Sequence, residues 1–185
     1  MMKIQDSRFK IQDSRIGFTL MEILVYIAVL SIVIVAIISF VLWFTHSNTK
    51  AKVMRETLDN ARRAMEIMSS EVKEAKSVYT PTSIFDSHPG QLSLETSKYL
   101  PEGEKTSFID FYLCDNRLCL KKESQDPVAL TSDSMEVNKL VFTRILSGES
   151  PSIQIDLTID YKNPTNRPEY QASVNLTSTA SLRNY

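Results

Sequence analysis

The sequence predicts an α+β fold in which one long N-terminal helix packs on a C-terminal antiparallel β-sheet domain. No proline occurs between Phe18 and Thr80, and apolar residues dominate the first half of that stretch. Near the C-terminus, residues 153–161 and 170–177 alternate between apolar and polar side chains. A period of two is typical of strands with one buried face, whereas a long proline-free stretch of this kind favours a helix. With 185 residues, the chain has room for one modest domain and one membrane segment.

The first part of the predicted helix, residues 18–44, is long and apolar enough to cross a membrane. No charged residue occurs from Ile23 to Phe44, and at about 1.5 Å per residue this run reaches roughly 33 Å. The run is too long for the apolar part of a secretory signal peptide, and no small-residue cleavage site follows it. An uncleaved signal anchor remains the alternative interpretation. The basic residues that precede and follow the span are similarly dense, so charge counting does not fix its orientation.

The residues at the start of this run form a distinctive pattern. Gly17 ends a short charged leader, Phe18 begins the apolar run, and Glu22 is the carboxylate that lies five residues past the glycine. The pattern resembles the prepilin signal of the type IV pilin and type II secretion pseudopilin families, over about residues 15–45. The resemblance implies that a prepilin peptidase removes residues 1–17 by cutting after Gly17 and then methylates the new amine of Phe18.

The resemblance also implies a role for Glu22 in filament assembly. An unpaired carboxylate in a bilayer costs about 2.5–3.5 kcal/mol or more, so a partner is expected. The positive amine of Phe18 on a neighbouring subunit would supply that partner in a head-to-tail filament. Ser39 stands where abundant pilins usually carry a proline, and in this the chain is similar to the minor J-type pseudopilins and W-type minor pilins.

These expectations define a function and a location. The resemblance implies a minor pilin or pseudopilin subunit that assembles into, or primes, a type IV pilus or a type II secretion pseudopilus. Its partners would be the prepilin peptidase, other pilins or pseudopilins, and the inner-membrane assembly platform. It would cross the bacterial inner (cytoplasmic) membrane once, with its N-terminus in the cytoplasm and its C-terminal domain outside. The alternative is a single-pass, signal-anchored extracytoplasmic domain for binding or adhesion, which would keep its leader.

A narrow apolar seam predicts that the helix continues to about Lys76, within an amphipathic segment at residues 45–79. Opposite charges one turn apart, such as Arg55 and Asp59, support an exposed opposite face. Small and flexible seam residues specify a coiled coil poorly, so we expect the seam to pack under a sheet. The seam residues follow one another at spacings of four and three: Met54, Leu58, Ala61, Met65, Met68, Val72, Ala75 and Tyr79.

Residues 80–185 are predicted to form the β-rich domain. Residues 81–107 contain three prolines, two glycines and many serines and threonines, which predicts loops around one short strand at 91–95. The connector 162–168 has the composition of a turn, so the last two strands should form a hairpin. Further strands are expected at residues 108–113, 118–122, 137–146, 153–161 and 170–177.

The rest of the chain does not point to an enzyme, a metal, a cofactor or a nucleic acid. Neither His46 nor His88 has a carboxylate or cysteine at ligand spacing, and no phosphate-binding or nucleophile motif occurs. The formal net charge of −1 provides no basic field for nucleic acid. The acidic positions Asp110, Asp115, Asp126 and Asp133 lack the alternating ligand pattern of a calcium loop.

Cys114 and Cys119 are the two cysteines, and they flank a predicted hairpin tip. A four-residue loop would place their sulfur atoms opposite each other, ready for a structural disulfide in an oxidising compartment. A two-residue turn at Asp115 and Asn116 would instead pair Cys114 with Arg117 and offset the cysteines. The sequence leaves both geometries open.

Overall fold

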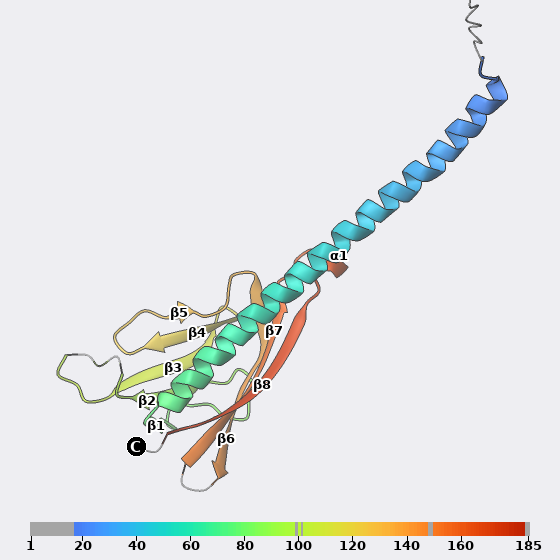
Figure 1. The fold of residues 1–185 in the computed structure, drawn as a ribbon. Coiled ribbons are helices and arrows are strands. Elements are labelled where there is room, and N and C mark those ends of the chain that lie inside the picture. Colours follow the sequence, from blue (N-terminus) through green and yellow to red (C-terminus); the bar gives the residue numbers. More distant parts are fainter. Residues whose placement is uncertain (1–16, 99, 101, 148–149, 184–185) are drawn as a thin grey trace, which may run out of the picture. The chain divides into compact units, whose positions relative to one another are not determined.

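The structure is a computed structural model that describes residues 17–98, 100, 102–147 and 150–183 (Figure 1). The predicted leader lies outside the described residues except for Gly17. The chain divides into two compact units, Met1–Phe44 and Thr45–Tyr185. Helix α1, Leu20–Glu74, contributes to both units. The coarse prediction of one long N-terminal helix followed by antiparallel β-structure is therefore confirmed.

In the first unit, α1 presents apolar side chains on every face. All side chains from Phe18 to Phe44 are exposed within the chain, Trp43 by 67%. A helix that is apolar all round needs apolar surroundings, either a protein core or a bilayer. Among the described residues, α1 is the one helix long and apolar enough to span a membrane.

In the second unit, α1 is amphipathic and buries one stripe. Ala61, Met65, Met68 and Val72 of the predicted seam are buried, and Ala75 is buried just beyond the helix end. The prediction was wrong at both ends of the seam, because Met54 is 46% exposed and Tyr79, beyond the helix, is 39% exposed. Three further residues of the stripe were missed by the seam: Val53, Thr57 and Ala64.

The error has a physical reason. The predicted seam repeats every seven residues, which is the period of a supercoiled helix. The observed stripe advances from Val53 by four, four and three residues to Ala64, and a second such step reaches Ala75. This eleven-residue period of about 3.67 per turn is close to that of a straight α-helix. This period fits a straight helix whose buried stripe packs against the two sheets.

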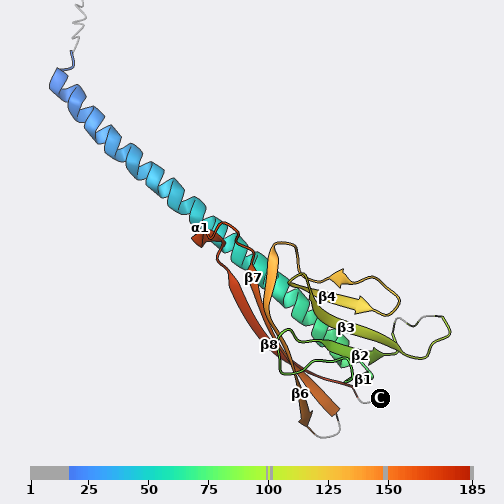
Figure 2. The ribbon, with the colours of Figure 1, turned by 180° about the vertical axis from the view of Figure 1, so that it is seen from behind.

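The β-domain contains two antiparallel sheets, where the sequence predicted one (Figure 1). The five-stranded sheet has the order β1-β2-β3-β4-β5 and the three-stranded sheet the order β6-β7-β8. Figures 1 and 2 together show both sheets on one side of the second half of α1. The strands are β1 (Ser77–Val78), β2 (Leu92–Thr96), β3 (Ser107–Cys114), β4 (Arg117–Lys122), β5 (Val128–Ala129), β6 (Met135–Ser147), β7 (Ser150–Tyr161) and β8 (Ser173–Ser181).

Most predicted strands agree closely with the observed ones. The alternation in β7 is confirmed, because Ile153, Ile155, Leu157 and Ile159 are all fully buried. The predicted hairpin with β8 is confirmed as well, but β8 starts at Ser173 and runs on to Ser181. Residues Pro168–Tyr170 form a short 3₁₀-helix, η1, where the last strand was expected to begin.

One hydrophobic core lies between α1 and the two sheets. Phe111 from β3, Phe142 from β6 and Met68 from α1 are all fully buried within it. The loop before β2 covers the outer edge of β6, since the backbone N–H of Gly90 donates to the carbonyl oxygen of Leu140 at 2.9 Å. A Cβ atom at Gly90 would lie 3.0 Å from that same oxygen, so the close approach favours glycine.

Candidate functional site at the start of the apolar helix

Gly17 and Phe18 precede the first turn of α1, and both are exposed. A Cβ atom added at Gly17 would have no heavy atom within 4 Å. Packing inside the described chain therefore does not require glycine at this position.

Thr19 caps the helix that begins at Leu20. The backbone N–H of Glu22 donates to Thr19 Oγ1 at 3.2 Å and to the Thr19 carbonyl oxygen at 3.1 Å. A threonine followed three residues later by glutamate is the signature of a capping box, a signal that our sequence reasoning did not use. The capped start also places the Glu22 carboxylate in the first turn, where the helix dipole favours negative charge.

The carboxylate of Glu22 has a neighbour one turn further along the helix. The Tyr26 hydroxyl donates to Glu22 Oε1 at 3.2 Å. The ring of Tyr26 also meets the ring of Phe18 edge-on, with centroids 6.4 Å apart and an interplanar angle of 74°. Glu22 and Tyr26 are four residues apart in α1, so they lie on one face of the helix, and the ring contact places Phe18 beside Tyr26. Sequence reasoning identified Phe18 and Glu22 but missed Tyr26, although this spacing could have pointed to it.

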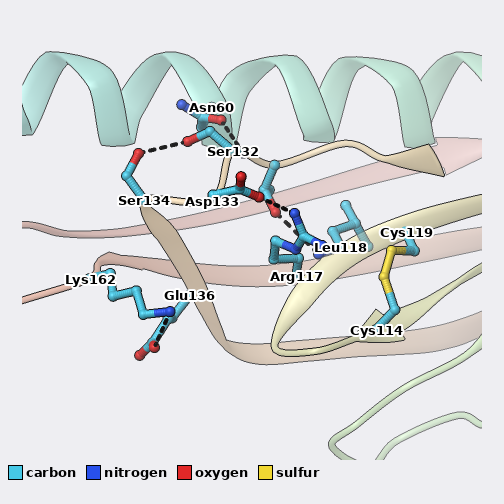
Figure 3. Close-up of polar contacts among 11 residues, drawn as sticks. Asn60, Cys114, Arg117, Leu118, Cys119, Ser132, Asp133, Ser134, Glu136 and Lys162 are labelled. Carbon is cyan, nitrogen blue, oxygen red and sulfur yellow. Dashed lines mark hydrogen bonds and ion pairs between the residues drawn. A yellow bond between two sulfur atoms is a disulfide. The ribbon is translucent and has the colours of Figure 1, made fainter.

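The second predicted feature, the Cys114–Cys119 pair, lies at the hairpin between β3 and β4 (Figure 3). Asp115 and Asn116 form the two-residue turn, with φ of 49° and 59°, and Cys114 pairs with Arg117. Two successive positive φ values are typical of a type I′ hairpin turn. The cysteines are therefore diagonal neighbours and not directly opposite each other. A disulfide nevertheless joins them, with the two Cα atoms 5.9 Å apart, which lies within the range that a disulfide can bridge.

Polar contacts attach the segment before β6 to this hairpin and to α1 (Figure 3). Arg117 forms an ion pair with Asp133, and the backbone N–H of Ser132 donates to Asn60 Oδ1 at 3.1 Å. The Ser134 hydroxyl donates to Glu56 Oε1 of the helix at 3.0 Å. Asp133, one of the acidic positions compared with a calcium loop, therefore pairs with the guanidinium group of Arg117.

The remaining residues that sequence analysis weighed for chemistry are dispersed. His46 lies 3.6 Å from Glu169, and His88 Nδ1 accepts a hydrogen bond from the backbone N–H of Leu140. Asp110 accepts a hydrogen bond from the hydroxyl of Ser93 at 2.5 Å. Within residues 17–98, 100, 102–147 and 150–183, no group of three or more His, Cys, Asp or Glu side chains is placed to hold a metal ion.

Two titratable groups in the β-domain have shifted pKa values. Hydrogen bonds from Ser77 and from Lys76, together with the charge of Lys76, hold the pKa of Glu95 below its ordinary value. Burial raises the pKa of Tyr161, and the nearby charge of Glu56 acts in the same direction. Both groups lie where β-structure meets the helix or its end, so the shifts reflect how the domain is held together.

Comparisons with protein-family models, with curated proteins and with solved structures found no match to this chain.

Proposed function

We propose that this chain is a minor pilin or pseudopilin subunit, cleaved after Gly17 and N-methylated at Phe18, that assembles into or primes a type IV pilus or a type II secretion pseudopilus. The observation that carries the proposal is the pattern of Gly17, Phe18 and Glu22 at the start of one long helix. The first half of that helix is apolar and exposed, and its second half forms one wall of a β-domain core. A subunit that joins a filament by packing apolar helices together needs an exposed apolar helix for its neighbours and a separate helical segment that packs in its own domain.

The surroundings of Gly17 support a role in recognition by another protein. A side chain there would meet nothing in the described chain. A protease that must approach the backbone closely, however, favours a residue without a side chain on the leader side. A plain signal anchor would account for the apolar helix but would give Gly17 and Glu22 no function.

Glu22 is the residue to which the proposal assigns assembly. Its carboxylate lies at the start of an apolar segment, where an unpaired charge is costly in lipid. The methylated amine of Phe18 on a neighbouring subunit would neutralise that charge and would set the axial register between subunits. The membrane, the neighbouring pilins and the assembly platform are the partners implied.

Processing is the direct test. The full chain is coexpressed with a prepilin peptidase, and the N-terminal peptide is identified by mass spectrometry beside a control prepilin. The expected product begins at N-methylated Phe18. Substitution of Gly17 by Ala should slow cleavage modestly, and Gly17→Arg should block it. A Cβ atom at residue 17 meets no heavy atom of the described chain within 4 Å, so the effect of Gly17→Ala on the rate of cleavage is attributed to the protease. An intact leader, when the control is processed, would favour the signal-anchored binding domain.

A further inference from the structure

Tyr26 is the one side chain shown to hydrogen-bond the Glu22 carboxylate, within the part of the chain that the structure describes. Its hydroxyl donates to Oε1 at 3.2 Å, and its ring contacts the ring of Phe18, which precedes the helix. Among the described residues, the Tyr26 side chain is 55% exposed and belongs to no hydrophobic core.

The geometry of this hydrogen bond leaves the carboxylate free to bind a second group. A carboxylate has two oxygen atoms and about four acceptor positions. Tyr26 engages Oε1, so Oε2 can accept a hydrogen bond from an ammonium group without displacing the hydroxyl. A hydrogen bond to a charged acceptor is stronger than a neutral one, and in apolar surroundings no water competes for it.

We infer that Tyr26 is a positioning residue for Glu22, which holds the carboxylate in one orientation so that Oε2 is ready for the amine of an incoming subunit. The inference rests on the proposed function, because it concerns the same pairing between Glu22 and Phe18. Without the hydroxyl, the flexible glutamate side chain must be ordered when the subunits meet. Ordering one such side chain costs about 1 kcal/mol, which lowers incorporation of the subunit about fivefold at 1.4 kcal/mol per tenfold.

The chain offers a closely matched set of variants. Tyr26→Phe keeps the ring and its contact with Phe18 and removes only the hydroxyl. Ser39→Ala is the control, because it also removes a hydroxyl from α1, one that bonds the Val35 carbonyl oxygen at 2.9 Å and is remote from Glu22. Glu22→Asp keeps the charge but is one methylene shorter, so it cannot maintain the bond to Tyr26. Glu22→Gln removes the charge itself.

The experiment measures incorporation of the full chain in cells that contain the peptidase and the neighbouring pilins. Crosslinked product is quantified relative to the processed, membrane-inserted subunit, so that changes in insertion or cleavage are divided out. We expect about a fivefold loss for Tyr26→Phe and none for Ser39→Ala. In the Glu22→Asp background, Tyr26→Phe should cause no further loss, because the two residues act through one contact.

The outcomes separate this inference from the proposed function. Normal incorporation of Tyr26→Phe together with a large loss for Glu22→Gln would overturn the positioning role and leave the assembly role of Glu22 intact. Losses that multiply in the double variant would also overturn it, since Tyr26 would then act on something else. Normal incorporation of both Tyr26→Phe and Glu22→Gln would overturn the inference and the proposed role of Glu22 together.

Discussion

Replacing Met68 by alanine should strongly destabilise the β-domain. Met68 lies in the buried stripe of α1 with none of its surface exposed, in contact with the core formed by both sheets. Truncating a fully buried methionine to alanine costs about 2–5 kcal/mol, from lost burial and from the cavity left behind. Because domains of this size are stable by only about 5–15 kcal/mol, the loss is a large share of the total.

Met54 provides the matched control on the same helix. It is the same residue type, but it is 46% exposed and lies outside the buried stripe. Met54→Ala is therefore expected to change stability by no more than about 0.5 kcal/mol. Comparing these two variants also tests the predicted seam against the observed stripe. Both Met54 and Met68 belong to the predicted seam, but of these two only Met68 belongs to the observed stripe.

Urea unfolding of the unit formed by residues 45–185, followed by circular dichroism, measures both effects. With an m-value of about 2 kcal/mol/M, the midpoint for Met68→Ala should fall by roughly 1–2.5 M, and that for Met54→Ala should stay almost unchanged. Equal losses for the two variants would refute the reasoning. They would mean that α1 presents the face predicted by seven-residue spacing.

Three further predictions concern the same domain. A fragment of residues 75–185 lacks the helix that covers the core faces of both sheets, so it should aggregate in light scattering, whereas a fragment of residues 45–185 should stay monomeric. Because its pKa is lowered in the folded state, the Glu95 carboxylate stabilises the fold above about pH 4.3, the ordinary glutamate pKa, and this contribution is lost as the pH falls through the lower pKa of the folded state. Glu95→Gln should therefore make the melting temperature depend less on pH between pH 6 and pH 3. Replacing both cysteines by serine should cost about 2 kcal/mol more in urea unfolding under oxidising conditions than under reducing conditions, because reduction opens the disulfide of the unchanged chain.

Local periodicity explains which parts of the fold could be predicted from the sequence. The β7 and β8 strands have one face on the core and one face in solvent, so their alternation identified them directly. Strands β1 and β5 have two residues each, which is too short for any period to appear. The division into two sheets depends on which strands pair although they are far apart in the sequence, and the residue pattern within a single strand does not predict its partner.

The candidate site was predictable where it depends on residue type and spacing. Gly17, Phe18 and Glu22 were identified from their spacing before an apolar run. Tyr26 was missed because a search for apolar runs counts tyrosine as one more apolar residue, and its hydroxyl matters only relative to Glu22. The disulfide geometry stayed open because turn length decides how the cysteines face each other, and the structure combines the two-residue turn with a diagonal bridge.

The two halves of α1 place different demands on their surroundings, and this contrast links the fold to the proposal. From Thr45 onward, the helix has one buried stripe, and the sheets of the same unit cover it. Before Thr45, the helix is apolar on every face and every described side chain is exposed, so the described part of the chain does not cover it. In our proposal, a bilayer and then the helices of other subunits cover that surface. A carboxylate at the start of such a segment is costly in lipid unless it has a partner. In our proposal, the Tyr26 hydroxyl orients the carboxylate within the subunit, and the amine of Phe18 on a neighbouring subunit supplies the counter-charge on assembly.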